Sequence, residues 1–425
     1  RLTSWKEIAS YLGVSDKTAQ QWEKTRQLPV ERVGNRVSIS ERDLQAWQQS
    51  SRTPLPPQIT SAPAPPEAAD RAWWESRRIL KLWSFSSTGI LLLGITAGIA
   101  YWWSSRAGPP VSVQWQGPVA TAVDVKGREV WQRRFPYPLM ILSTVAVDIL
   151  APWIGDADGD GRSETILPYY HVKREAEGWD LYCISSRGEV LWRLAPARVV
   201  SNATSTFRGP YVLRGYSVFP SPERDGTHWT AGVFVHHTEY PAVLLVVDGK
   251  GKQRGEFWHA GHLNSLRTLD LDGDGVVELL AGGVQHGAEQ AVLVVLDPRR
   301  IEGAAQLEPA AHPLQLQKMS KGTEKVVVYF PRTALNRTQD QFNFLNELEI
   351  VNGLMQASVY EHLGPPQSYL IYTLAKDFTV KTLTRSVSYI NAFMQLRQQR
   401  QLDFITGAEE VEGLKKQVRV VRRSP

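Results

Sequence analysis

Two stretches of the chain combine alternating acidic residues with glycines, a pattern suited to holding a hard cation. Residues 156–164 read DADGDGRSE and residues 270–278 read DLDGDGVVE, so both fit the pattern DxDGDGxxE. Calcium takes six to eight oxygen ligands, and acids on alternate residues of a tight loop can direct their carboxylates inward. We expect side-chain oxygens from the first, third, fifth and ninth positions and a backbone carbonyl from the seventh. The predicted calcium ligands are Asp156, Asp158, Asp160, Arg162 and Glu164 in the first loop, and Asp270, Asp272, Asp274, Val276 and Glu278 in the second.

A simpler interpretation of these stretches is a turn whose aspartates only accept hydrogen bonds from backbone amides. Each stretch is followed by a strand-like apolar run, TILPYY or LLAGG, and its last acid stands at position nine rather than at position twelve as in an EF-hand. In this respect the loops resemble those of FG-GAP and VCBS repeats, which implies calcium-binding blades of an integrin-α-like propeller. The related stretch PSPERDGTHW has Pro220 and Pro222 where acids would be needed, and we expect no ion there.

The long C-terminal part of the chain has the texture of an all-β, propeller-like domain. Short runs rich in Val, Tyr, Trp and Thr alternate with Gly and Pro, as in successive strands and turns. Three hairpin-like stretches, VDVKGREVW, ISSRGEVLW and VVDGKGKQRGEFW, each lead from a glycine to a tryptophan. Their turn glycines, Gly127, Gly188 and Gly251, indicate a period of about 60 residues, which suggests four-stranded blades. We expect such blades over residues 106–300, and over residues 301–425 either diverged blades with a helical insertion near residues 388–399 or a separate α+β cap. The strand-like runs in this last part are VVVYF, ASVYE, YLIYTL and VRVV.

The composition and motifs give no indication of an enzyme. The chain lacks a phosphate loop, a GxSxG motif, an HExxH motif and zinc-spaced cysteines. The pairs His236 and His237, and His259 and His262, fit ordinary loop positions better than metal ligands. The single cysteine, Cys183, excludes an intramolecular disulfide and fits a packed thiol. The net charge of +5 over 425 residues is too small to identify a partner.

The first 51 residues carry the pattern of a small helical module. Ser4 and Glu7 have capping-box spacing ahead of the helical run WKEIASYL, and Ser15 can cap a second helix after the turn at Gly13. Two short helices joined by a glycine-containing turn form a helix-turn-helix. The run LPVERVGNRVSIS then predicts a β-hairpin, and Ser40 can cap a third helix.

This stretch resembles the winged helix-turn-helix domain of the MerR and excisionase type. The resemblance implies that the second helix and the hairpin contact DNA, whose bases and phosphates suit polar and basic side chains. The expected DNA-binding residues are Lys17, Thr18, Gln20, Gln21, Lys24, Arg32 and Arg36. The alternative is a degenerate module that makes only protein contacts. A domain of this size reads a half-site, so we expect a homodimer for specific binding.

Between these parts lies the apolar run LWSFSSTGILLLGITAGIAYWW at residues 82–103. It lacks charge, is long enough to cross a bilayer as a helix, and has tryptophan or tyrosine near both ends. Arg77, Arg78 and Lys81 precede it, so the positive-inside rule places the N-terminus in the cytoplasm. We therefore expect a Pro/Ala-rich linker with a basic juxtamembrane segment at 52–78 and a transmembrane helix at 79–105.

The order of these parts predicts a multidomain protein: a small winged helix-turn-helix, one transmembrane helix and an all-β, propeller-like extracytoplasmic domain. The function expected is that of a one-component transcription regulator in a bacterial inner membrane, with DNA, calcium and an unidentified outer ligand as partners. A membrane-anchored adhesion or scaffold protein is the alternative. In that case the helix-turn-helix would contact proteins only.

Overall fold

Two units, residues 1–88 and 89–425, make up this computed structural model. The structure describes residues 2, 4, 5, 7, 8, 28–33, 36–40, 42 and 43 in the first unit, and 107–140, 151–173, 177–309, 312–362, 364, 366–399, 401 and 407–423 in the second. The expected linker at 52–78 and membrane helix at 79–105 lie outside these residues. Within the described ranges, no helix combines the length and apolarity needed to cross a membrane.

The first unit shows the short hairpin predicted around Gly34 and Asn35. Strands β1 (Glu31–Val33) and β2 (Arg36–Ser38) pair antiparallel, with Val33 opposite Arg36. Ile8, Leu28, Val37 and Ile39 are buried together and form the small core of this unit. The alternation of apolar residues in LPVERVGNRVSIS thus corresponds to a real hairpin that packs on the first helical turn.

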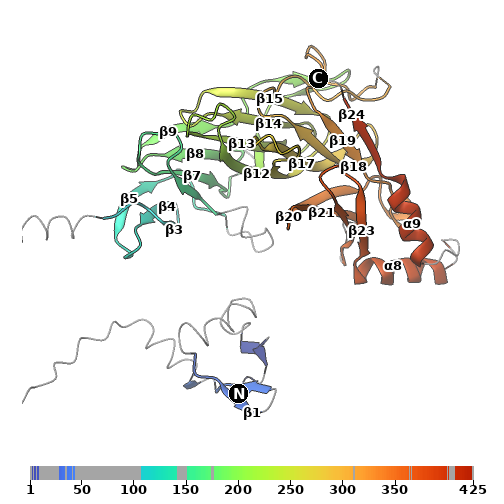
Figure 1. The fold of residues 1–425 in the computed structure, drawn as a ribbon, viewed down its shortest axis with the longest axis horizontal. Helices are drawn as coiled ribbons and strands as arrows, with labels where there is room; N and C mark the ends of the chain where they lie inside the picture. Colours follow the sequence, from blue (N-terminus) through green and yellow to red (C-terminus); the bar gives the residue numbers. More distant parts are fainter. Residues whose placement is uncertain are drawn as a thin grey trace, which may run out of the picture. The chain divides into compact units, whose positions relative to one another are not determined.

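The second unit consists of antiparallel sheets formed by strands that follow one another in the chain, except that the C-terminal strand β24 (Arg419–Arg422) returns to an earlier sheet (Figure 1). We number the five larger sheets in chain order. The first sheet contains β3 (Ser112–Gln116), β4 (Val119–Val123) and β5 (Glu129–Arg134). The second contains β6 (Trp153–Gly155), β7 (Glu164–Tyr169), β8 (Asp180–Ile184) and β9 (Val190–Leu194). The third contains β12 (Tyr211–Pro220), β13 (His228–His236), β14 (Ala242–Val247) and β15 (Gln253–His259).

The fourth and fifth sheets bring the C-terminal third of the chain into the same array. The fourth contains β16 (Leu263–Leu269), β17 (Glu278–Gln285), β18 (Gln290–Leu296), β19 (Val326–Tyr329) and β24 (Arg419–Arg422). The fifth contains β20 (Phe344–Val351), β21 (Leu354–His362), β22 (Ser368–Leu374) and β23 (Val380–Arg385). The minor elements are the pair β10 (Val200–Ser201) and β11 (Thr206–Phe207), and the helices α7 (Ala334–Gln339), α8 (Val387–Gln398) and α9 (Gly407–Gln417). The fourth sheet thus joins strands from both sides of the boundary expected at residue 300.

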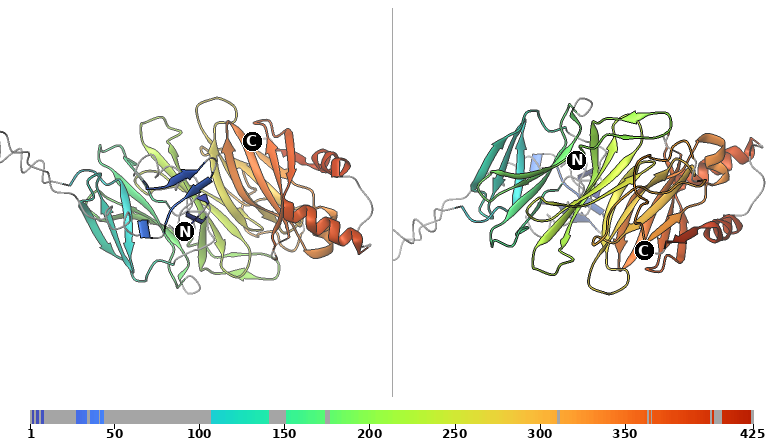
Figure 2. Two further views of the ribbon diagram at one scale, coloured as in Figure 1. Left: turned by 90° about the horizontal axis from the view of Figure 1, so that it is seen from below. Right: turned by 90° about the horizontal axis from the view of Figure 1, so that it is seen from above.

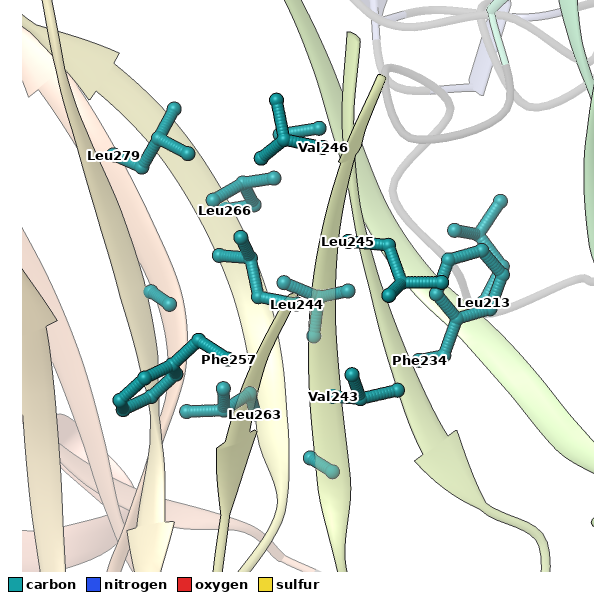
Figure 3. Close-up of a cluster of buried hydrophobic side chains, with 14 of the residues drawn as sticks. Leu213, Phe234, Val243, Leu244, Leu245, Val246, Phe257, Leu263, Leu266 and Leu279 are labelled. Atoms are coloured by element: carbon teal, nitrogen blue, oxygen red, sulfur yellow. The ribbon is translucent and has the colours of Figure 1, made fainter. Parts of the chain in front are cut away.

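Successive sheets pack face to face, and inner strands such as β7, β14 and β17 are buried along their whole length. Strand β14 has the sequence AVLLVV and every residue of it is buried, as a strand between two layers requires. In Figure 3, Leu245 points towards Leu213 and Phe234, whereas Leu244 points towards the side of β16, where Leu263 and Leu266 lie. In the three views of Figures 1 and 2 the first and fifth sheets lie at opposite ends of this unit, so the described sheets form an open array.

The repeat of turn glycine and tryptophan seen in the sequence corresponds to a contact between neighbouring sheets. Gly188 has φ +83°, and a Cβ placed on it would lie 2.9 Å from the Cβ of Trp131 in the preceding sheet. Gly251 has φ +80°, and a Cβ there would lie 2.5 Å from Cγ of Trp192. Only glycine satisfies both the left-handed backbone and this close approach. We call these two contacts the glycine–tryptophan contacts.

Candidate functional site

The helix-turn-helix residues that the structure describes adopt the predicted capping arrangement. The Ser4 hydroxyl accepts a hydrogen bond from the backbone N–H of Glu7 at 3.2 Å, and the Ser40 hydroxyl accepts one from Asp43 at 3.1 Å. Each serine thereby satisfies a backbone donor at the start of a helix. In the hairpin, Arg32 lies opposite Val37 and Arg36 lies opposite Val33. The other predicted DNA-binding residues, Lys17, Thr18, Gln20, Gln21 and Lys24, lie outside the described residues.

The first acidic loop connects β6 to β7 and folds around its own aspartates. Both carboxylate oxygens of Asp156 accept backbone N–H groups, from Gly159 at 2.7 Å and from Gly161 at 2.9 Å. Both glycines have φ near +80°, which lets the backbone curl around the carboxylate. Glu164 is the first residue of β7, is 2% exposed, and accepts the N–H of Ala157 at 2.9 Å. Burial, and to a smaller degree the neighbouring aspartates, raises the pKa of Glu164, while the Ala157 N–H lowers it.

The second loop connects β16 to β17 with the same set of hydrogen bonds. Asp270 accepts the N–H groups of Gly273 and Gly275 at 2.7 and 3.1 Å, and Glu278 accepts that of Leu271 at 2.9 Å. Glu278 is 1% exposed. The shared sequence pattern therefore produces one backbone conformation at two places, each at the entrance of the second strand of a sheet.

In each loop three of the predicted ligands come together. One oxygen each of Asp156, Asp158 and Glu164 lies within 4.8 Å of the others, and the same holds for Asp270, Asp272 and Glu278. Sets of carboxylate oxygens without nitrogen or sulfur donors suit a hard cation such as calcium. The fifth-position acids do not belong to these two sets. Asp160 accepts the N–H of Arg162 at 2.8 Å and Asp274 that of Val276 at 2.8 Å. The sequence thus located the three converging acids of each loop.

The two loops differ in the positive charges around them. Nζ of Lys325 donates to Oε1 of Glu278 at 2.7 Å and lies 3.4 Å from Oδ2 of Asp272. Arg299 pairs with Asp274 at 2.9 Å, and Lys376 donates to the backbone carbonyl of Asp270 at 2.6 Å. Burial alone lowers the pKa of Lys325, but the contacts with Glu278 and Asp272 raise it above its ordinary value. Sequence reasoning missed these cations because none of them belongs to the loop motif.

The stretch PSPERDGTHW forms the turn between β12 and β13 and contacts both loops. Arg224 in this turn donates to the backbone carbonyl of Asp274, and His228 lies with its Nδ1 at 3.0 Å from the carbonyl oxygen of Asp156. Asp225 accepts from the N–H and hydroxyl of Thr227 at 3.1 and 2.7 Å. The carboxylate of Asp225 therefore stabilises its own turn. Through Arg224 and His228, this turn contacts both acidic loops.

The candidate histidines form hydrogen bonds with backbone groups, and the cysteine is buried. His259 donates through Nε2 to the Val284 carbonyl at 3.0 Å, and Nε2 of His262 lies 2.9 Å from the Glu239 carbonyl oxygen. His236 accepts the N–H of Glu239 at 3.1 Å. Burial lowers the pKa of His259 to about 4 and raises the pKa of Cys183, which has no exposed surface. His236 and His259 are the last residues of strands β13 and β15 rather than loop residues, whereas Cys183 is packed in the core as expected.

Comparison with known proteins places one part of the chain in a family. No curated protein sequence matches the chain. Among solved structures, the C-terminal domain of Pseudomonas aeruginosa PilY1 aligns over 64% of this chain and 71% of its own, with a TM-score of 0.34 and 10% sequence identity. Residues 4–52 match the helix-turn-helix domain family. The N-terminal part of the chain is therefore a helix-turn-helix domain, and it is followed by a large domain made mostly of β-sheet.

Proposed function

We propose that this chain is a membrane-anchored transcription regulator with a cytoplasmic DNA-binding head and an extracytoplasmic, calcium-binding β domain. The observation that carries the proposal is the helix-turn-helix domain at residues 4–52, a module suited to reading duplex DNA. The charge-free run at 82–103 supports the membrane anchor, and the arginines and lysine before it support a cytoplasmic head.

Calcium is the proposed cofactor of the β domain. Its support is the donor chemistry of the loops, in which three carboxylates converge within 4.8 Å. When bound, the ion would crosslink the start of each loop to the first residue of the following strand, through Asp156 and Glu164 or through Asp270 and Glu278. The ion would therefore make the end of the sheet more rigid. We assign no chemical reaction to it.

Dimerisation is the proposed link between the outer domain and DNA. A single helix-turn-helix reads one half-site, so pairing two heads raises the affinity for a two-fold operator through effective concentration. Gly94 and Gly98 form a GxxxG step in the predicted span that would let two helices approach closely. An outer ligand that favours paired chains would thereby favour DNA binding.

The proposal is tested by DNA binding of the detergent-solubilised full chain across a salt series. We expect sequence-selective retention of duplexes from a random pool, with affinity falling steeply as salt rises because phosphate contacts release counterions. The variant Lys17→Ala/Lys24→Ala should reduce the slope of log affinity against log salt by about two, since each lost phosphate contact removes about 0.9.

The matched control changes two exposed turn lysines of the β domain, Lys126→Ala/Lys250→Ala, and should keep the wild-type slope. Weak retention with no sequence preference, unaffected by the Lys17 and Lys24 changes, would contradict the regulator. That outcome would favour the alternative of a membrane-anchored adhesion or scaffold protein.

A further inference from the structure

The two acidic loops have the same backbone hydrogen bonds but differ in the basic side chains that contact them. In the second loop, an ammonium group already occupies the side of the acidic cluster where Glu278 and Asp272 meet. Nζ of Lys325 lies 2.7 Å from Glu278 and 3.4 Å from Asp272, which are hydrogen-bonding and ion-pair distances. A calcium ion bound by these two carboxylates would have to displace this ammonium, because like charges that close repel strongly.

Lys325 is anchored to the fourth sheet through its backbone, and its side chain is 37% exposed. It directly precedes β19, and its backbone N–H donates to the Val295 carbonyl of β18 at 2.8 Å. Glu278 is 1% exposed, so the ammonium neutralises a carboxylate that water scarcely reaches. Arg299 adds a second cation by pairing with Asp274 at 2.9 Å. The four acids of the second loop are thus matched by two basic side chains.

The corresponding corner of the first loop carries no such cation. The residue that directly precedes β9, the fourth strand of that sheet, is Glu189, and the turn before it contains Ser185. Among the described residues, no lysine or arginine forms an ion pair with Asp156, Asp158, Asp160 or Glu164. Arg254, which lines a cavity of about 130 Å³ together with Asp158, pairs instead with Asp248 at 2.9 Å and with Glu223 at 3.2 Å.

We propose that the chain binds one divalent cation rather than two, in the loop of residues 156–164. The loop of residues 270–278 is closed by Lys325, whose ammonium takes the place of the ion. The inference rests on the proposed calcium function and assigns it to a single site. It predicts an affinity for calcium in the second loop on the order of 100-fold below that of the first, because ligand charge sets the affinity of such sites.

The test is the stoichiometry of calcium binding to the full chain in detergent after removal of metal with a chelator, measured by isothermal titration calorimetry. The wild-type chain should bind one ion, and Asp156→Asn/Asp158→Asn should bind none with comparable affinity. Lys325→Met should bind two, with affinities within about tenfold of each other. Adding Asp272→Asn to Lys325→Met should remove the second ion, which locates it in the second loop.

Two further variants keep this result interpretable. Lys376→Met removes a cation that contacts the same loop only through the Asp270 carbonyl, and should still bind one ion. Lys325→Gln removes the charge with a polar side chain, in case the methionine variant fails to fold, and should also bind two. Calcium should raise the thermal midpoint of either Lys325 variant more than that of the wild type, because the ion replaces the lost partner of Glu278.

Two ions of similar affinity in the wild type would overturn the inference, and so would a single ion in both Lys325 variants. A failure of every variant to bind calcium is a different result. It would overturn the proposal that these loops bind calcium, and this inference with it. DNA binding by the helix-turn-helix domain is measured independently and would be unaffected.

Discussion

Glu361 in β21 illustrates how one buried carboxyl group can affect stability. It has no exposed surface, and its oxygens accept hydrogen bonds from the Thr333 hydroxyl at 2.8 Å and from Nδ2 of Asn343 at 2.9 Å. Burial, only partly offset by these donors, raises its pKa to about 7. A carboxyl whose folded pKa lies above its unfolded value binds its proton more tightly in the folded state. It therefore contributes stability below pH 4.5 that is lost as the pH rises through about 7.

We expect Glu361→Gln to flatten this pH dependence. Between pH 5 and pH 8 the wild type should lose on the order of 2 kcal/mol of unfolding free energy relative to the variant. Chemical denaturation at several pH values measures the difference between the two proteins. The lowered pKa of His259 makes both of them less stable as the pH falls, and this effect cancels in the difference. The control Glu349→Gln changes an exposed glutamate of the adjacent strand β20 and should follow the wild type. A wild-type curve parallel to that of Glu361→Gln would contradict the pKa assignment.

At the residue scale, the sequence predicted the acids of the two loops but not their partners. Asp156, Asp158 and Glu164 lie within one motif, so the geometry of a single turn brings them together. Lys325 is 47 residues from Glu278 and reaches it only because β19 and β17 belong to the same sheet. Spacing along the chain carries no information about such a contact.

At the scale of elements, the sequence predicted the hairpins and the helix near residues 388–399 because both leave periodic patterns. Helix α8 begins after Ser386, whose hydroxyl accepts the N–H of Tyr389, and it buries Tyr389, Phe393 and Leu396. The strand-like runs in residues 301–425 also proved to be strands β19, β21, β22 and β24. The glycine–tryptophan contacts were visible as a repeat, but their partners in neighbouring sheets were not.

The glycine–tryptophan contacts predict a large effect of one added methyl group. Gly251→Ala should destabilise the β domain by about 2 to 4 kcal/mol, because it combines a left-handed backbone with a clash against Trp192. Gly127→Ala is the matched control, since Gly127 has φ +74° but no atom within 4 Å of the added Cβ. It should cost about 1 to 2 kcal/mol from the backbone alone. Thermal unfolding of the two variants measures this, and equal losses would show that the contact with Trp192 contributes nothing.

At the scale of the whole molecule, the sequence predicted a domain made mostly of β-sheet but not which strand would complete the fourth sheet. The pattern VRVV near the C-terminus identified a strand, yet nothing local indicated that β24 would pair with β19, with Val327 opposite Val421. Between β19 and β24 the described chain forms the fifth sheet and helices α7, α8 and α9. Beyond β24, Arg423 reaches Glu324 at 2.8 Å, and the side chain of Glu324 has no exposed surface.

Removing that ion pair should weaken the whole β domain. Arg423→Met leaves the Glu324 carboxylate buried without its partner, which costs about 3 to 5 kcal/mol in comparable cases. Chemical denaturation of the full chain should show this loss. The exposed Arg187→Met should change the unfolding free energy by less than about 0.5 kcal/mol. A similar small change for Arg423→Met would show that Glu324 is neutral or hydrated in the folded protein.

The pairing of β24 with β19 also has a consequence for biosynthesis. Ribosomes add residues in order, so β19 emerges about 90 residues before the strand that covers its edge. During this interval its sequence VVVY presents unpaired backbone groups and β-branched side chains, the combination that favours association with other chains. The nascent protein therefore passes through a stage in which the fourth sheet is one strand short. A chaperone or fast completion of the chain would matter most at that stage.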